Sequence, residues 1–415
     1  MPTNTLRAMI AAAGAALLLT AAACGAVGNP LSNRSSAPSA PTSSGDAPAT
    51  ASPTTPPPPD PVNLTANVAD GAPKVTVDTL VKAKAATGTL TKVKLTFSYT
   101  DRNGRPVKGT VPGKVSKDRV TWTAADRLEP AATYQLSMTG KNPEGQSRTI
   151  THTFTTHKLT LDEQTWPTLY PLPGSKVGIG MPVVLTFDVP VKDKKEFQKN
   201  LEVTSSPAQT GSWRWFSDTQ VRFRPARYWK PGTKVTVRAN LNGVKAGGGV
   251  YGQKSAATSF RIGRSLVTRI NLASDVAKVY RNGKLVRTIY VSGGKPGWET
   301  RSGIKLIMAK QTNKKMTNEM IGAKEDYSLV ARHALRITNS GEFLHSAPWN
   351  TAHFGRRNAS HGCTGMSNGS AAWLYRNTMI GDPVVTTGSN RRVEDGNGYS
   401  DWNVSYAQYK KGSAL

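Results

Sequence analysis

One short segment near the carboxyl end of the chain concentrates the side chains that could do chemistry. Residues 341–368 read GEFLHSAPWNTAHFGRRNASHGCTGMSN and contain three of the six histidines and one of the two cysteines. A thiol becomes a useful nucleophile when a nearby imidazole takes its proton and a third group orients that imidazole. Cys363 is therefore the candidate nucleophile, and His345 and His361 are the candidate bases.

The spacing of these residues predicts how they meet. His361 stands two residues before Cys363 and so lies on the same side of a strand or tight loop, whereas His345 has to arrive from an adjacent strand. Gly362 lies between the two and lets backbone amides turn toward a bound carbonyl as an oxyanion hole.

The residues alone leave two other interpretations open. Cys363 could be a structural, buried cysteine with histidines at the surface. A zinc site is the other alternative, although none of the common short cysteine and histidine spacings is present; its ligands would be His345, His353, His361 and Cys363.

The other cysteine lies in a predicted export signal. Arg7 precedes an apolar run over residues 8–23, which ends in Ala21, Ala22, Ala23, Cys24 and Gly25. The run is short for a membrane span, which needs about 20 residues, and small residues suit cleavage directly before Cys24. The pattern resembles a bacterial lipobox and predicts lipidation at Cys24, with simple secretion or an uncleaved anchor as alternatives. Lipidation would leave Cys363 without an intramolecular disulfide partner.

Lysine and arginine outnumber aspartate and glutamate by 54 to 26, a formal net charge of +28, and loss of Arg7 with the signal leaves +27. In a cytosolic protein such a charge would suggest nucleic acid as the partner. Outside the membrane the polyanions are lipid headgroups and wall polymers, so we expect these partners and no nucleic acid. The alternative is that the positive charge serves only solubility and indicates no partner.

The organisation of the chain follows from its composition. Residues 1–23 form the predicted signal peptide, and residues 24–62 form a tether rich in Pro, Ala, Ser and Thr, which could extend on the order of 90 Å. Period-two alternation, as in Val93, Leu95, Phe97 and Tyr99, predicts a β-sandwich over residues 63–158. The scheme repeats over residues 159–264, where Val221 and Phe223 follow Val120 and Trp122 at a spacing of 101. Pro231 likewise follows Pro130, but Thr233 follows Thr133 one position out of register.

Residues 265–390 read as a third, β-rich domain. A hairpin is expected over residues 276–291, with Asn282 and Gly283 in its turn. One helix is predicted from about Gly369 to Thr378, capped by Ser367 or Asn368, and another strand follows it at residues 381–385. Residues 391–415 are predicted to form an extension that packs on this domain. The predicted fold class is mainly β, with two immunoglobulin-like sandwiches ahead of a β-rich catalytic domain that has one short helix.

These motifs resemble a known family. His345, Ser346, Ala347, Pro348 and Trp349, followed by Ser360 to Cys363, resemble the signature of the L,D-transpeptidase, or YkuD-like, catalytic domain. The whole arrangement resembles actinobacterial lipoprotein members with two immunoglobulin-like domains. The resemblance implies that Cys363 is the nucleophile, that His345 is the general base, and that the Ser346 carbonyl orients its imidazole. It implies that the loop around the thiol is formed by Ser360, His361 and Gly362.

Further positions follow from the same resemblance. Tyr327 falls where the family has a lid tyrosine over the substrate, and Met308 resembles a methionine that lines the same pocket; both could instead be ordinary core or loop residues. Ser340 and Gly341 match backbone that holds the donor peptide. Gly365 departs from the Asn of many relatives, and residues 300–303, Thr-Arg-Ser-Gly, depart from a Thr-Pro-x-Gly turn.

The resemblance implies a function without a metal or organic cofactor. The enzyme would form 3→3 cross-links between diamino-acid residues of peptidoglycan stem peptides through a cysteine thioester, with release of D-Ala, and would be a carbapenem target. It would act on the outer face of the membrane, anchored through Cys24. Transfer of the acyl group to water or to a protein amine is an alternative, and a non-catalytic wall-binding protein is another.

Overall fold

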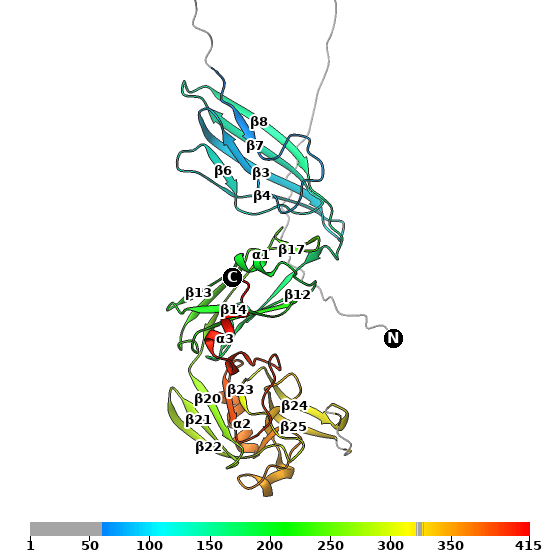
Figure 1. Ribbon diagram of the computed structural model, residues 1–415, viewed down its shortest axis with the longest axis vertical. Coiled ribbons are helices and arrows are strands. Elements are labelled where there is room, and N and C mark those ends of the chain that lie inside the picture. Colours follow the sequence, from blue (N-terminus) through cyan, green and yellow to red (C-terminus); the bar gives the residue numbers. More distant parts are fainter. Residues whose placement is uncertain (1–59, 321, 323–325, 327) are drawn as a thin grey trace, which may run out of the picture. The chain divides into compact units, whose positions relative to one another are not determined.

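The computed structural model describes residues 60–320, 322, 326 and 328–415 (Figure 1). The predicted signal segment, Cys24, Tyr327 and all but the last three residues of the predicted tether lie outside the described residues. Within the described part of the chain, no helix combines the length and apolar character needed to cross a membrane.

The first sandwich packs two four-stranded sheets, with strand orders β1-β2-β6-β5 and β4-β3-β7-β8. Alternation produces its core: Tyr134, Leu136 and Met138 on β7 are fully buried, while the residues between them face outward or lie partly buried. The predicted alternating run from Val93 to Tyr99 lies on β3. The strands are β1 (Leu64–Ala66), β2 (Lys82–Ala85), β3 (Thr89–Thr100), β4 (Pro106–Val111), β5 (Gly113–Val115), β6 (Thr121–Ala124), β7 (Thr133–Lys141) and β8 (Ser147–Thr155).

The second sandwich has its own core and the sheet orders β10-β12-β15-β14 and β11-β19-β16-β13, with a small sheet β17-β18-β9. A helix, α1 (Lys194–Lys199), connects β12 to β13 along the chain. The Asp193 side chain caps its first turn. The strands are β9 (Gln164–Thr165), β10 (Pro167–Tyr170), β11 (Lys176–Val177), β12 (Val183–Phe187), β13 (Leu201–Ser206), β14 (Gly211–Ser217), β15 (Gln220–Pro225), β16 (Lys234–Ala239), β17 (Lys245–Gly247), β18 (Val250–Gly252) and β19 (Ala256–Ile262).

The spacing of 101 residues reflects equivalent strands. Trp122 on β6 and Phe223 on β15 each occupy the third strand of a four-stranded sheet. The offset continues into the next strand, because β7 begins at Thr133 and β16 begins at Lys234. Thr233 therefore lies one position before the equivalent of Thr133, as the sequence register indicated, and the prediction of two tandem sandwiches is confirmed.

The third domain is built on a nine-stranded sheet in the order β23-β28-β20-β21-β22-β27-β26-β25-β24. The predicted hairpin is present as β21 and β22, and the predicted helix is α2 (Asn368–Asn377), where the Ser367 hydroxyl accepts a hydrogen bond from the Ser370 amide. The strands are β20 (Leu266–Asn271), β21 (Val276–Arg281), β22 (Lys284–Ser292), β23 (Gly303–Leu306), β24 (Ala309–Thr317), β25 (Ser328–Arg336), β26 (Phe343–Ser346), β27 (Thr364–Met366) and β28 (Pro383–Thr387). The 3₁₀ turns are η1 (Asn318–Met320) and η2 (Pro348–His353).

The carboxyl-terminal extension has two parts. Its first part packs on the third domain, where the Ser302 amide donates to the Arg391 carbonyl at 2.7 Å and the Val393 amide donates to the Ser302 carbonyl at 2.9 Å. Its last part, with η3 (Asp401–Asn403) and α3 (Tyr406–Lys410), also packs on the second sandwich. Arg222 of β15 donates to the Asp401 carboxylate at 3.0 Å, and both side chains are buried. The prediction named the third domain, and the contact with the second sandwich adds to it.

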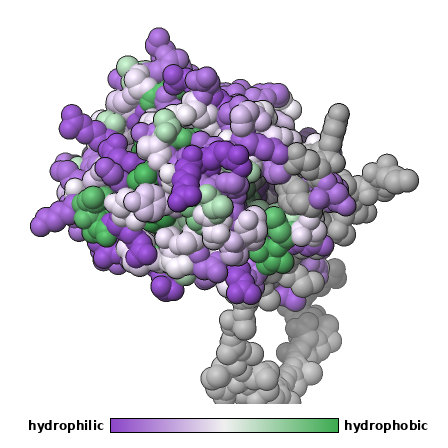
Figure 2. Space-filling view, turned by 90° about the horizontal axis from the view of Figure 1, so that it is seen from below, coloured by the Kyte–Doolittle hydropathy of each residue, from purple (hydrophilic) through white to green (hydrophobic). Residues whose placement is uncertain are grey.

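The molecular surface is largely polar. Figure 2 shows one face on which hydrophilic residues dominate and hydrophobic residues gather only in small, separate patches. This distribution agrees with the high content of lysine and arginine.

Candidate active site

Neighbouring strands bring the predicted base and nucleophile to the same place. β26 and β27 pair in parallel, with Leu344 opposite Thr364 and His345 opposite Gly365. Cys363 immediately precedes β27 and therefore lies next to the start of β26, the strand that carries His345. The expectation that His345 arrives from the adjacent strand is met.

Both side chains open into one cleft with a volume of about 580 Å³. Most of the predicted site residues line this cleft, namely Ser340, Gly341, His345, Ser360, His361, Cys363 and Gly365. A cleft of this size that joins a thiol and an imidazole is a suitable place for covalent chemistry.

The imidazole of His345 is fixed by the backbone that follows it. Its Nδ1 lies 2.8 Å from the carbonyl oxygen of Ser346, so Nδ1 carries the proton and Nε2 keeps its lone pair. The ring stacks on Trp349 at 6.0 Å between centroids, and the Ser346 hydroxyl donates to the Asn368 side chain. Burial lowers the pKa of His345, although the bond to Ser346 opposes this effect. The imidazole is therefore neutral and oriented at neutral pH.

The thiol of Cys363 is also neutral. The residue is partly exposed to the cleft, but protein surrounds its sulfur, and this burial raises the pKa of the thiol to about 12. The thiol donates a weak hydrogen bond to the Gly341 carbonyl at 3.7 Å, and the Phe343 amide donates to the sulfur. The sequence suggested a thiolate held by a histidine, whereas the cleft holds a neutral thiol bonded to the Gly341 carbonyl and a neutral imidazole bonded to the Ser346 carbonyl.

The loop before Cys363 is held by its own hydrogen bonds. The Ser360 hydroxyl donates to the Cys363 carbonyl at 2.5 Å and accepts from the Gly362 amide at 3.1 Å. Gly362 has a φ of 111°, which favours glycine, and its carbonyl accepts from the Thr300 hydroxyl at 2.8 Å. The expectation that Gly362 lets backbone amides form an oxyanion hole stays a prediction, while the Gly362 amide itself is engaged within the loop. Its role here is to shape the loop.

The other predicted residues occupy different surroundings. His361 lines the cleft and meets the Trp298 ring edge-to-face at 5.3 Å. The Ser340 amide and hydroxyl bond the Asn397 side chain, each at 3.0 Å, so the extension holds this segment in place. A Cβ at Gly365 would lie 2.9 Å from the Cβ of Ala347. The Asn of many relatives would therefore require Ala347 to move.

Met308 does not line the cleft, and this prediction was wrong. Met308 borders a separate cavity together with Arg222 and Tyr399, and a Cβ on Gly398 would lie 2.7 Å from its sulfur. Met308 lies in the short connection between β23 and β24. The direction of a side chain in such a connection depends on packing that the sequence does not reveal. The zinc alternative finds no support, because the described residues contain no group of three or more His, Cys, Asp or Glu side chains placed close enough together to hold a metal ion.

Sequence reasoning missed several residues of the cleft wall. Lys314 and Met316 on β24 and Arg336 on β25 all line the cleft. Lys314 and Met316 are two residues apart on one strand and so share a face, which was the available signal. The two cations give part of the wall a positive charge.

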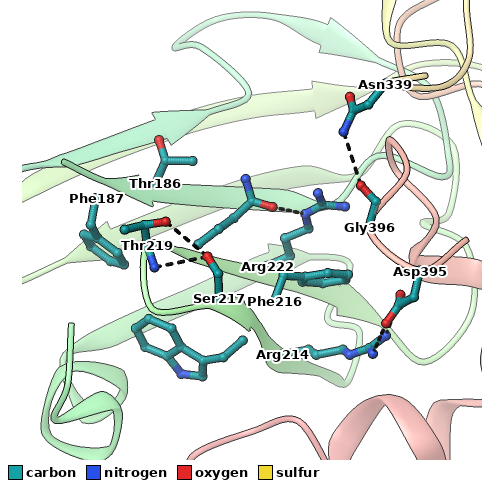
Figure 3. Close-up of a pocket in the computed structure, with 12 residues that line it drawn as sticks. Thr186, Phe187, Arg214, Phe216, Ser217, Thr219, Arg222, Asn339, Asp395 and Gly396 are labelled. Carbon is teal, nitrogen blue, oxygen red and sulfur yellow. Dashed lines mark hydrogen bonds and ion pairs between the residues drawn. The ribbon is translucent and has the colours of Figure 1, made fainter. Parts of the chain in front are cut away.

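A second cavity, of about 420 Å³, lies where β14 and β15 of the second sandwich approach the extension (Figure 3). Its lining shares only Asn339 with the cleft. Phe216 lies between the guanidinium groups of Arg214 and Arg222, at 4.7 and 4.2 Å from its ring centroid. Arg214 pairs with Asp395 of the extension. This cavity holds no thiol or imidazole, so the chemistry belongs to the cleft.

Comparison with known proteins agrees with this geometry. Residues 267–386 match the L,D-transpeptidase catalytic domain, and residues 72–245 match a bacterial Ig domain, a range that includes strands of both sandwiches. The chain is 32% identical over 356 residues to L,D-transpeptidase 2 of Mycobacterium tuberculosis, covering 85% of each protein. The chain belongs to the L,D-transpeptidase family. L,D-transpeptidase 5 of the same organism is 32% identical over 369 residues, which cover 86% of this chain and 78% of that protein.

Among solved structures, an L,D-transpeptidase in complex with imipenem is 32% identical, with a TM-score of 0.47, and the match covers 53% of this chain and 97% of the other. The family implies that this chain acts in peptidoglycan cross-linking. The roles of its individual residues rest on the geometry of the cleft.

Proposed function

We propose that this L,D-transpeptidase forms 3→3 cross-links between stem peptides through a thioester on Cys363. The observation that carries the proposal is the oriented imidazole of His345, bonded through Nδ1 to the Ser346 carbonyl, in the same cleft as the only thiol of the described residues. Lys314 and Arg336 in the cleft wall suit the carboxylates of a stem peptide.

The first half-reaction releases D-Ala. The Cys363 sulfur attacks the carbonyl carbon of the diamino acid at the third stem position, while its proton passes to Nε2 of His345. The tetrahedral intermediate collapses, the bond to D-Ala breaks, and the His345 imidazolium returns the proton to the leaving amine. A thioester and free D-Ala result. Because thiol and imidazole are both neutral at rest, the proton moves during the attack rather than before it.

The second half-reaction forms the cross-link. The side-chain amine of a second stem attacks the thioester carbonyl, and His345 takes a proton from this amine. The Cys363 thiolate leaves and recovers a proton from the imidazolium, which restores the neutral pair. Water or a protein amine in place of the second stem would give hydrolysis or attachment instead.

We further propose that the enzyme works outside the cytoplasm, anchored through lipid on Cys24 and extended into the wall by the tether. The net positive charge suits anionic wall polymers or lipid headgroups as neighbours. Carbapenems, which carry a reactive lactam carbonyl, are expected to acylate the same thiol.

The test is product analysis with purified disaccharide tetrapeptide as the substrate. Tandem mass spectrometry should find dimers joined from the third residue of one stem to the third residue of the other, and free D-Ala in equal amount. Cys363→Ala should remain folded and make neither product. If tripeptide is the only product besides D-Ala, the enzyme hydrolyses its thioester. If the folded wild type shows no turnover, a non-catalytic wall-binding protein is favoured.

A further inference from the structure

One wall of the active-site cleft is the turn between β25 and β26. Asn339, Ser340 and Gly341 of this turn line the cleft together with Cys363. The Gly341 carbonyl accepts the thiol hydrogen bond at 3.7 Å, so the turn lies directly beside the sulfur. A donor peptide whose carbonyl carbon reaches this sulfur therefore lies against the turn, and the conformation of the turn affects how the donor is held.

The hairpin itself holds the start of this turn more firmly than its tip. The Arg336 guanidinium donates to the carbonyls of Thr338 and Asn339, at 2.9 and 2.6 Å. At the tip, the Gly341 amide reaches the Thr338 carbonyl only at 3.4 Å, and the hydroxyls of Ser340 and Thr338 lie 3.2 Å apart. The Ser340 amide has no partner within β25, the turn and β26, all of which the structure describes. The tip therefore depends on a contact from outside the hairpin.

The carboxyl-terminal extension supplies that contact through Asn397. The side-chain oxygen of Asn397 accepts from the Ser340 amide, and its side-chain amide donates to the Ser340 hydroxyl, each at 3.0 Å. One residue earlier, the Gly396 carbonyl accepts from the Asn339 side chain at 3.2 Å (Figure 3). Asn397 therefore clamps Ser340 through both its backbone and its side chain.

The segment that carries Asn397 is itself anchored on both sides. The Asn397 side-chain amide also donates to the Glu394 carboxylate at 2.7 Å, and Glu394 pairs with Arg301 of the catalytic domain at 2.6 Å. On the other side, the Gly398 carbonyl accepts from the buried guanidinium of Arg222 at 2.9 Å. A side chain on a segment fixed in this way can hold a neighbouring turn in one conformation.

We propose that Asn397 is a positioning residue of the reaction, whose side chain clamps Ser340 so that the turn beside Cys363 keeps the conformation that binds the donor peptide. The proposal rests on the proposed function in taking Cys363 as the nucleophile that a stem peptide acylates. Without the clamp the turn samples other conformations, and the apparent affinity for the donor falls by the fraction that remains competent. A donor that is already bound reacts as before, because the thiol and His345 are unchanged.

The test measures acylation of the full chain by tetrapeptide, at increasing tetrapeptide concentration, in the wild type and in Asn397→Ala. Asn397 is half-buried, so the shorter side chain leaves no cavity in the core. The half-saturating concentration should rise about tenfold, the loss expected for two hydrogen bonds, while the maximal acylation rate is retained. Alkylation of Cys363 by iodoacetamide, separated from Cys24 by peptide mapping, should stay within about twofold, because the clamp does not bury the sulfur.

Asn403→Ala is the matched control. Asn403 lies in the same extension, and its side chain accepts from the Ile304 amide and donates to the Ile304 carbonyl, each at 2.7 Å, but it does not line the cleft. This variant loses the same kind of contact and should change neither acylation nor alkylation. An unchanged half-saturating concentration in Asn397→Ala, or an equal rise in both variants, would overturn the proposal. A large change in alkylation of Asn397→Ala would also overturn it, because the whole cleft would then have loosened.

Hydrogen exchange of the Ser340 amide separates this proposal from the proposed function. A folded wild type that is never acylated by tetrapeptide would contradict the proposed function, whereas amide exchange would still decide whether Asn397 holds the turn. The Ser340 amide should exchange at least about tenfold faster in Asn397→Ala than in the wild type and at the wild-type rate in Asn403→Ala. Equal exchange in the wild type and Asn397→Ala would show that the turn needs no clamp, and the proposal would be wrong.

Discussion

The neutral state of Cys363 predicts an unusual pH dependence for its reaction with simple alkylating reagents. The perturbation is pH itself, applied to the wild-type chain. Burial places the thiol pKa at about 12, against 9.0 for an ordinary cysteine. Only the thiolate reacts, so at neutral pH the buried thiol should be alkylated about a thousandfold more slowly than the same cysteine in the denatured chain.

The assay follows iodoacetamide incorporation at Cys363 by peptide mapping from pH 6 to 10. In the folded protein the logarithm of the rate should rise by about one per pH unit, with no plateau below pH 10. The denatured chain is the matched control and should level off near pH 9. Because burial also lowers the pKa of His345, no second step should appear near pH 6.5.

A plateau below pH 8 in the folded protein would refute this reasoning. It would mean that a thiolate is held by an imidazolium at rest, as the sequence motif suggested. A plateau that is lost in His361→Gln but kept in His345→Gln would in addition make His361 the base.

Other predictions concern the base, the extension and the anchor. His345→Gln should slow acylation by tetrapeptide by about a hundredfold or more, measured by stopped-flow or quenched mass spectrometry, and an unchanged rate would exclude it as the base. Asp401→Ala leaves the Arg222 guanidinium buried without its carboxylate and should lower the free energy of unfolding by about 3–5 kcal/mol in urea titrations. Asp395→Ala, which removes a half-exposed ion pair, should cost less than about 1 kcal/mol, and equal losses in the two variants would contradict the argument. Cys24→Ala should abolish palmitate labelling and release the protein from membranes, whereas unchanged membrane retention would indicate an uncleaved anchor.

Much of the fold was predictable because its signals are local. Alternation in runs such as residues 93–99 located the strands, and the capping side chain of Ser367 marked the start of the helix. The repeat of 101 residues identified two sandwiches because equivalent strands bury side chains at equivalent positions. Spacing also predicted that His345 arrives from the strand next to Cys363, and His345 lies on β26 beside β27, which Cys363 directly precedes.

What the sequence did not reveal depends on contacts between distant segments. Lys305 and Glu342 are 37 positions apart and form a buried pair only because the fold brings β23 close to the segment before β26. Met308 turned toward another cavity because its direction is set by packing against Gly398 in the extension. The neutral state of the thiol follows from burial, which no short motif encodes.

The most direct test of the central claim is the intact mass of the protein after incubation with a carbapenem. The wild type should gain the mass of one carbapenem, and digestion should map the adduct to Cys363, while Cys363→Ala should gain nothing. An adduct that persists in Cys363→Ala, or a folded wild type that gains no mass at all, would contradict the assignment of Cys363 as the nucleophile.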